Sequence, residues 1–268
     1  MAYDIIDAHA HIFPEKIAFK ATQSIGSFYD IPMDKVGSSE QLIESGCRIG
    51  VSRYLVCSTA TKPEQVESIN DFIHAECMKH PSFVGLGTIH PDIQDPMREL
   101  ERIRELGLHG VKLHPDFQLL DIDEERMIPL YKRCAELGLP ILFHTGDDRY
   151  DYSRPQKLYS VKQRVPELTA IAAHFGGYRR WDEAAKYLKL DGIYFDTCSS
   201  LFLLKKQDAL DLLHYFGTDK FFFGTDFPMW DHEEELQRFL NLGLDYETNK
   251  RILHDNFAEF MHLDADER

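Results

Sequence analysis

Two histidines separated by one residue are the first side chains in the sequence that could do chemistry. His9 and His11 follow a short apolar run at 3–8 that reads as a buried strand. Side chains two apart in an extended chain point the same way, so both imidazoles would project from one face at the end of this strand. Neutral imidazole is a common ligand for zinc and related metals. Two ligands do not make a metal site, so the spacing predicts one only if the chain supplies others.

Further polar groups stand where other apolar runs end. Of the 13 histidines in the chain, six stand at such ends, together with one lysine and one aspartate. The residues concerned are His9, His11, His90, Lys112, His114, His144, His174 and Asp226. Histidines scattered over a surface would not gather at these positions. Imidazole and carboxylate groups suit a divalent cation, so the pattern strengthens the prediction of a metal site.

The elements that must position these groups are short apolar runs that alternate with amphipathic helical stretches. The eight runs lie at 3–8, 51–57, 83–89, 109–113, 139–143, 168–173, 192–197 and 220–225. Helical stretches are expected at 63–79, 96–106, 124–137, 181–190, 201–216 and 232–242. Eight such units predict a (β/α)8 TIM barrel, in which functional groups lie at the carboxyl ends of the strands. A doubly wound open sheet is the alternative, but no glycine-rich phosphate loop follows any run.

Two segments stand outside the eightfold pattern. Residues 14–37 are expected to form a long irregular insertion after the first strand, of the length common in lids and binding loops. Residues 246–263 are expected to form an extra closing helix. No linker rich in Gly, Ser or Pro divides the sequence, so a single domain is predicted over residues 1–268.

Composition excludes several classes of partner. Hydrophobic residues make up 43% and charged residues 28% of the 268 positions, as in a globular protein with a substantial core. A formal net charge of −15 argues against binding to nucleic acid or an anionic membrane. The five cysteines form no Cys-x-x-Cys, which disfavours both a disulfide framework and a thiolate zinc site. With no signal peptide and no apolar run of membrane-spanning length, a cytoplasmic location is expected.

Taken together, these motifs resemble the amidohydrolase superfamily, specifically its amidohydrolase-related branch, which is typified by aminocarboxymuconate semialdehyde decarboxylase. The resemblance covers almost the whole chain and includes the His-x-His of the first strand, a histidine on the fifth and sixth strands and an aspartate on the eighth. It implies that His9, His11, His144 and Asp226 bind one metal ion per chain and that His174 lies beside it. Zinc is the expected ion, and manganese also suits this set of ligands.

Such a ligand set has a definite chemistry. Three neutral imidazoles and one carboxylate leave a divalent ion with net positive charge and an open position, where the pKa of a bound water falls to ~7. Asp226 would bind the ion and accept a proton from the water. His174 would polarise a substrate carbonyl or orient the hydroxide. These two residues are the expected catalytic groups.

Lys112 has two interpretations. In binuclear members of the superfamily, a carboxylated lysine on the fourth strand bridges two metals, and His174 would then ligate the second. Here Lys112 is followed by Leu-His-Pro, which looks more like the mononuclear branch, where the lysine would pair with a buried acid such as Asp7. One metal ion per chain is therefore the expectation.

A carboxylate-bearing small molecule is the expected substrate, and it would need a cationic partner in the protein. Cations on loops that should face the site, each of which could instead be a solvated loop charge, are Arg149, Arg154, Arg179 and Arg180. Lys112 and His114 are further candidates for substrate binding.

The expected reaction is hydrolysis of a small amide, lactone or ester by metal-activated water, with non-oxidative decarboxylation of a small unsaturated or aromatic acid as the alternative. A non-catalytic metal-binding or scaffold protein would be expected to lack at least one of the five strand-end groups that the resemblance assigns to the metal site. None is missing, since the sequence has His9, His11, His144, His174 and Asp226. The family resemblance also makes a homodimer an expectation.

Overall fold

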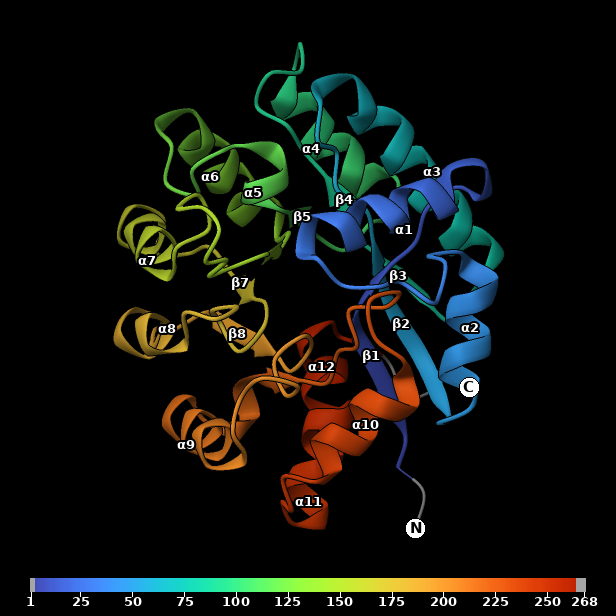
Figure 1. Ribbon diagram of the computed structural model, residues 1–268. Coiled ribbons are helices and arrows are strands. Elements are labelled where there is room, and N and C mark those ends of the chain that lie inside the picture. Colours follow the sequence, from blue (N-terminus) through green and yellow to red (C-terminus); the bar gives the residue numbers. More distant parts are fainter. Residues whose placement is uncertain (1–2, 264–268) are drawn as a thin grey trace. The chain divides into compact units, whose positions relative to one another are not determined.

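The computed structural model describes residues 3–263, and its chain divides into two compact units (Figure 1). Unit 1 contains the chain up to Val56 and the chain from Thr197 onward, and unit 2 runs from Cys57 to Asp196. Each unit is described by itself, and the single domain expected over residues 1–268 stays a prediction.

Unit 1 combines the N-terminal and C-terminal parts of the chain. Its strands are β1 (Ile5–His11), β2 (Val51–Cys57, whose last residue belongs to unit 2) and β9 (Phe221–Phe222). Its helices are α1 (Glu15–Tyr29), α2 (Ser39–Cys47), α9 (Lys206–Phe216), α10 (His232–Leu240), α11 (Tyr246–Lys250) and α12 (Asn256–Phe260). A 3-10 turn at Thr218–Lys220 precedes β9, and a π-helical turn at Arg251–Asp255 joins α11 to α12.

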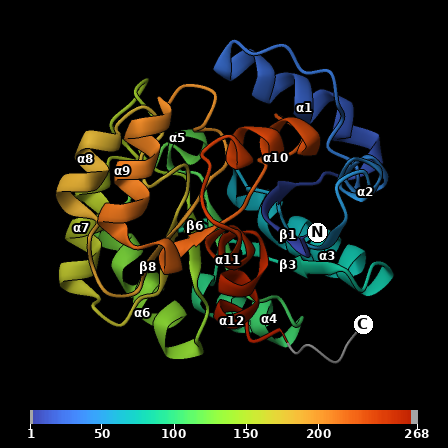
Figure 2. The same ribbon diagram turned by 90° about the horizontal axis from the view of Figure 1, so that it is seen from below.

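Strand β1 is the centre of unit 1. It neighbours β2 on one side, and on the other the Ala8 N–H donates to the Phe223 carbonyl at 2.8 Å. A parallel bridge joins Ala10 to Phe227, so the segment after β9 continues alongside β1. Ile5 and Ile6 are both buried, as in a strand covered on both faces. The C-terminal helical segment from α11 to α12, the predicted closing helix, packs near β1 and β9 (Figure 2).

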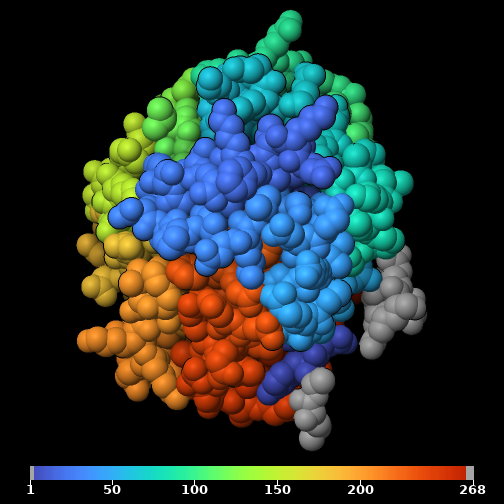
Figure 3. Space-filling view, turned by 45° about the vertical axis from the view of Figure 1, so that its right-hand side comes forward, coloured from blue at the N-terminus to red at the C-terminus, as the bar shows by residue number. Residues whose placement is uncertain are grey.

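The segment after β1 differs from the sequence prediction. An irregular insertion was expected over 14–37, but α1 forms a 15-residue helix there. Its buried stripe consists of Ala18, Thr22, Gly26 and Tyr29, which follow helical spacing but are mostly small or polar. Apolar periodicity was therefore too weak to predict this helix. In the space-filling view, this N-terminal part of unit 1 and its C-terminal part adjoin on the surface (Figure 3).

Unit 2 alternates strands and helices. Its strands are β3 (Phe83–Gly85), β4 (Gly87–Thr88), β5 (Val111–Leu113), β6 (Ile141–Phe143), β7 (Ala170–Ala172) and β8 (Ile193–Asp196). Its helices are α3 (Val66–Lys79), α4 (Pro96–Glu105), α5 (Pro115–Gln118), α6 (Ile128–Leu137), α7 (Pro155–Arg164) and α8 (Trp181–Tyr187), with 3-10 turns at Pro63–Gln65 and Glu125–Met127. The single run predicted over 83–89 is thus two short strands.

Strands β4 to β8 of unit 2 are parallel and in register. β4 to β8 pair in chain order, and Leu113, Phe143 and Ala172 lie at equivalent positions on β5, β6 and β7. Figure 1 shows α6, α7 and α8 along one side of these strands. Since parallel strands end at the same edge, this register brings His114 and His144, the residues after β5 and β6, to one level.

Helix boundaries in unit 2 follow the signals in the sequence. α4, α5 and α7 each begin at a proline, and α6 is followed directly by Gly138, which has φ +67°. No helix within residues 3–263 is long and apolar enough to cross a membrane.

Candidate metal centre and active site

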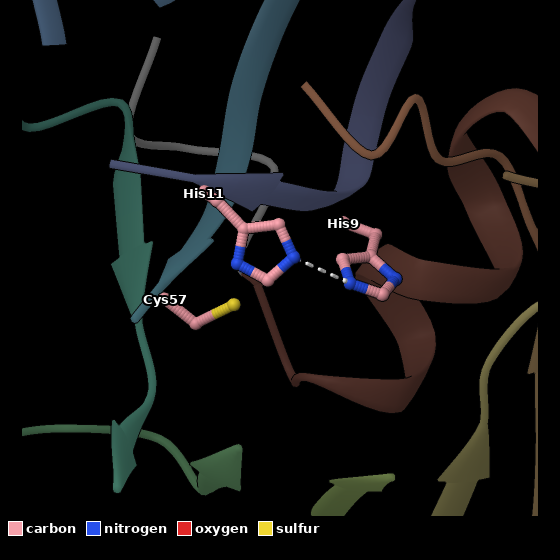
Figure 4. Close-up of side chains that lie close together, drawn as sticks. All are labelled: His9, His11 and Cys57. Carbon is pink, nitrogen blue, oxygen red and sulfur yellow. Dashed lines mark hydrogen bonds between the residues drawn. The ribbon is translucent and has the colours of Figure 1, made fainter. Parts of the chain in front are cut away.

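His9 and His11 lie close together at the end of β1, as their spacing predicts. Their Nε2 atoms are 3.2 Å apart, and a dashed line joins the two rings in Figure 4. His9 is fully buried, whereas the side chain of His11 is 15% exposed. The pair therefore has one anchored imidazole and one at the edge of solvent.

Asp226 brings a carboxylate to the same two imidazoles. Its Oδ1 atom lies 3.1 Å from His11 Nε2 and 3.7 Å from His9 Nε2. The backbone fixes this placement, because the Asp226 N–H donates to the His9 carbonyl at 2.8 Å. Asp226 has φ +60°, a left-handed conformation that ordinary residues adopt only when their surroundings enforce it.

This spacing fits the ligands of one divalent ion. Two donors bound to an ion at ~2.1 Å in tetrahedral geometry lie ~3.4 Å apart, and the three distances among His9, His11 and Asp226 run from 3.1 to 3.7 Å. Two imidazoles with one carboxylate are also the donor types that zinc and manganese accept. Unit 1 thus brings together three of the four expected metal ligands.

The far side of the His9 ring contacts a residue that the sequence analysis did not select. Cys198 Sγ lies 3.2 Å from His9 Nδ1. If Nδ1 carries the ring proton, it donates to sulfur and leaves the Nε2 lone pair for a metal, which is how outer contacts commonly orient ligating histidines. Cys198 directly follows the seventh apolar run, so the strand-end rule could have found it.

In unit 2, the fourth expected ligand lies beside the second expected catalytic group. His144 Nδ1 and His174 Nε2 are 2.9 Å apart. The His174 backbone is held at φ +63° by its own N–H, which donates to Asp196 Oδ1 at 2.8 Å, and by its carbonyl, which accepts from the Trp181 indole at 3.0 Å. Both imidazoles are buried.

The other nitrogen of His144 faces an aspartate. Asp147 Oδ2 lies 3.4 Å from His144 Nε2, while its Oδ1 accepts the Arg149 N–H at 2.9 Å. Burial raises the pKa of Asp147, but its interactions with His144 and Arg149 outweigh this and lower the pKa to about 2. With a carboxylate at Nε2, the nitrogen of His144 that is suited to a metal is Nδ1.

Asp116 is the second buried acid near His144. Its Oδ2 atom lies 3.9 Å from His144 Nε2. Burial raises the pKa of Asp116, and the nearby His144 only partly offsets this effect. Asp116 thus adds a second buried carboxyl to the surroundings of His144.

The cluster of His114, Asp116 and His144 is poorly shaped for a metal of its own. Its donor atoms lie within 4.8 Å of one another, but the His114 and His144 rings stack at 3.9 Å with 9° between their planes. An imidazole lone pair points along the ring plane, so an ion aligned with one ring would lie well outside the plane of the other. Phe117 covers the second face of His114 at 3.7 Å. His114 is therefore placed here as a stacking group.

Arg149 and Arg179, two of the expected substrate-binding cations, meet at one acid. Both lie 3.9 Å from Asp148, and Arg149 also lies 3.4 Å from Asp147. The Arg179 guanidinium lies 5.4 Å from the centre of the Tyr178 ring. The two side chains thus share one loop cluster in unit 2, and their role in substrate binding stays a prediction.

The remaining candidate cations have structural partners. Arg154 pairs with Glu183 at 3.1 Å, and Arg180 donates to the Asp147 carbonyl at 3.0 Å. Lys112 is buried on β5, next to Thr88 and Leu142 in the register. Asp7, its suggested partner, accepts hydrogen bonds from the Thr225 N–H at 3.0 Å and hydroxyl at 2.6 Å.

Comparisons with known proteins extend these observations. The sequence model of the amidohydrolase family matches residues 6–262. A curated relative, the 2-amino-3-carboxymuconate-6-semialdehyde decarboxylase of Dictyostelium discoideum, is 28% identical over 132 residues, which cover 41% of this chain and 37% of the relative. The match thus spans well under two thirds of that relative's length.

Solved structures show the same fold. A TIM-barrel protein from Bordetella bronchiseptica gives a TM-score of 0.76 at 21% identity, over 97% of this chain and 98% of that one. A dihydroxybenzoic acid decarboxylase from Polaromonas sp., with bound manganese and an inhibitor, gives 0.74 at 16% identity, over 98% of both chains. Other similar structures carry the names of decarboxylases and of 2-pyrone-4,6-dicarboxylic acid hydrolases. These likenesses confirm the predicted (β/α)8 TIM-barrel fold class.

Proposed function

Because this chain belongs to the amidohydrolase family, we propose that it is a metal-dependent carboxy-lyase acting on a small unsaturated or aromatic acid. Enzymes of this superfamily depend on a metal ion. The spacing of His9, His11 and Asp226, from 3.1 to 3.7 Å between donor atoms, is the observation that carries the metal-dependent part of the proposal.

We assign the ion to His9, His11 and Asp226, which unit 1 brings together, and propose His144 as the fourth ligand. The inclusion of His144 comes from the strand-end pattern and the family. The Asp147 carboxylate at its Nε2 supports it, since this leaves Nδ1 as the ligating atom. Zinc and manganese both suit three imidazoles and one carboxylate, and manganese is bound in the similar dihydroxybenzoic acid decarboxylase.

Decarboxylation is favoured by the names of the related proteins. The curated relative and several similar structures are decarboxylases of unsaturated or aromatic acids. Hydrolysis, which the sequence analysis placed first, is the less well supported reaction. It remains the second candidate, because proteins named as 2-pyrone-4,6-dicarboxylic acid hydrolases share the fold and because the same ligand set can activate water.

The proposed reaction needs one proton and no oxidant. The carbon–carbon bond to the carboxylate breaks, carbon dioxide leaves, and the electron pair that remains on the substrate carbon takes up a proton. When bound, the ion supplies positive charge that holds the acid and stabilises the developing negative charge. Asp226, through its carboxyl group, and His174, through Nε2, are the groups we assign to hold and deliver the proton. An arginine such as Arg149 or Arg179 would orient a second polar group of the substrate.

The test is a reaction screen with matched histidine variants. Protein stripped with a chelator and reloaded with zinc or manganese would be incubated with a panel of aromatic and unsaturated acids, and carbon dioxide release would be measured. We expect release that requires the metal, is lost in H9N, and is retained in H214N, which changes an exposed histidine on α9 in the same way.

Two results would contradict the proposal. Metal-dependent turnover of lactones, esters or amides without carbon dioxide release would assign the enzyme to the hydrolases. Turnover that survives both chelation and the H9N substitution would rule out the metal mechanism altogether.

A further inference from the structure

We propose that Ser199 and Trp230 are positioning residues, which form a hydrogen-bond chain that fixes the Asp226 carboxylate with Oδ1 toward the two imidazoles of β1. This inference rests on the proposed function, since it assigns these residues a role toward the proposed metal ligand. All the residues of this hydrogen-bond chain belong to unit 1.

The direction of the hydrogen bonds in this chain follows from the groups involved. The Trp230 Nε1–H lies 2.8 Å from Ser199 Oγ, and an indole N–H can only donate. The serine oxygen therefore accepts from the indole, and its own proton is available for another acceptor. Asp226 Oδ2 lies 2.5 Å from Ser199 Oγ, a short distance typical of a hydroxyl that donates to a charged carboxylate.

A competing acceptor lies nearby but is weaker. Met229 Sδ is 3.7 Å from Ser199 Oγ, and a thioether is a weak acceptor compared with a carboxylate. The shorter, charge-assisted bond to Asp226 therefore determines where the hydroxyl proton points. The result is a one-way chain from Trp230 through Ser199 to Asp226.

Packing and backbone conformation hold the residues of this hydrogen-bond chain in place. The Trp230 ring packs against Phe202 with 4.5 Å between ring centres, and the Arg238 guanidinium lies 4.8 Å from its centre. Ser199 is buried and has φ +48°. Together with φ +60° at Asp226, two residues in the left-handed region meet at one hydrogen bond. Such conformations persist where the surrounding structure enforces them, and they are concentrated at functional sites.

The chain divides the two oxygens of Asp226 between different tasks. Oδ2 accepts the Ser199 proton, while Oδ1 is the atom within 3.1 Å of His11 Nε2 and 3.7 Å of His9 Nε2. A carboxylate held in this way presents one oxygen to an ion in a fixed orientation. Without the hydroxyl, rotation about the terminal bond would exchange the two oxygens and weaken the ligand geometry.

The experiment measures metal affinity in the full-length protein and does not depend on turnover. Dissociation constants for zinc would be obtained by competition with a chromophoric chelator for the wild type, S199A, S199G and W230F. The matched control is S200A, which removes the hydroxyl of the adjacent buried serine, whose Oγ donates to the Cys198 carbonyl at 3.0 Å. The visible spectrum of cobalt-substituted protein would report the ligand geometry.

We expect S199A and S199G each to weaken zinc binding by about 10- to 100-fold, the range seen when an outer partner of a metal ligand is lost. Both should alter the cobalt spectrum, and S200A should change neither. S199G relieves the left-handed backbone conformation, so a loss shared by both variants is due to the hydroxyl and not to strain. W230F should weaken binding less, and it should add nothing when combined with S199A, because the indole acts through the serine.

Each outcome separates this inference from the proposed function. Wild-type affinity and an unchanged cobalt spectrum in S199A and S199G would refute the hydrogen-bond chain and leave the metal enzyme intact. Additive effects of W230F and S199A would also refute it. A wild-type protein that binds no divalent ion would instead refute the proposed function on which the inference rests.

Discussion

The substitution G146A adds one methyl group close to the site, and we expect it to lower both the stability and the activity of the protein. Gly146 has φ +82° and lies two residues after His144 in the loop that follows β6. A Cβ built on Gly146 would lie 2.3 Å from the Cα of Gly177, in the loop that follows β7. This close approach keeps the loop that carries His144 against the loop that follows His174.

The loss of stability in G146A has two causes, the left-handed backbone conformation and overpacking. Substitution of a second glycine isolates the first cause. Gly138 has φ +67°, but a Cβ there would meet nothing within 4 Å. G138A should therefore cost only the left-handed backbone term, about 1 kcal/mol. At Gly146 the 2.3 Å contact is far below the ~3.5–4.0 Å at which carbon atoms pack. The neighbouring backbone must then move by ~1 Å or more, so overpacking should add about 1–3 kcal/mol.

Urea unfolding measures the loss of stability. Steady-state kinetics on the substrate identified by the screen measures the damage to the site. We expect G146A to lower the free energy of unfolding by about 2–4 kcal/mol and G138A by about 1 kcal/mol. A shift of ~1 Å in a group that positions the reaction costs about 100-fold in rate, so kcat/KM should fall by that order in G146A alone. Equal unfolding free energies and equal activities in the two variants would refute this account of the Gly146–Gly177 contact.

Three further predictions test buried charges and thiols. In D147N the side-chain oxygen can still accept the Arg149 N–H but the negative charge near His144 is lost, so zinc affinity should fall by about 10-fold or more in a chelator competition; unchanged affinity would mean that Asp147 only caps its loop. Burial raises the pKa of Glu235 from its ordinary 4.5 to about 7, so the folded protein binds the extra proton between these values. The resulting stability is fully present below pH 4.5 and is lost as pH rises through 7, by about 3 kcal/mol in total. Unfolding curves of E235Q should lack this decline, and a parallel decline in both proteins would contradict the assignment. Burial raises the pKa of Cys134 to about 12, so iodoacetamide at pH 8 should modify the exposed Cys47 and spare Cys134 until the protein is unfolded, as intact mass would reveal.

The strands were predictable because their sequences carry the signal locally. The runs at 109–113 and 139–143 contain β5 and β6, which pair in the parallel register expected of consecutive βα units. That register places His114 and His144 at one level, where their rings stack. Helix α1 escaped prediction for the opposite reason, since its buried face is made of residues such as Thr22 and Gly26, which give no apolar period.

The site was predictable to the extent that strand ends determine it. His9, His11 and Asp226 were expected near one another by this rule, and unit 1 brings them together. Ser199 stands two residues after the apolar run at 192–197, so the same rule could have found it, but a serine is not a typical metal ligand. The hydrogen bond from Trp230 to Ser199 could not be predicted, because it depends on how two loops of unit 1 fold.

Asp147 shows how one residue can satisfy two interpretations of a sequence. Its Oδ1 caps the loop after β6 by accepting the Arg149 N–H. Its other oxygen faces His144 Nε2. The same carboxylate caps a turn and contacts a proposed metal ligand, so only the three-dimensional structure could reveal both roles.

Each unit orients its share of the proposed ligands by contacts of its own, which are hydrogen bonds in unit 1 and a carboxylate–imidazole contact in unit 2. In unit 1 the chain from Trp230 through Ser199 orders Asp226, and in unit 2 Asp147 faces His144 on the nitrogen opposite to the proposed ligand atom. Ordering a flexible side chain on binding costs about 0.5–1.5 kcal/mol. Donors whose orientation is already fixed avoid most of this cost, so removal of either outer partner should weaken metal binding without removing a ligand. For the same reason, S199A and D147N should each lower the affinity for the ion although every proposed ligand is retained.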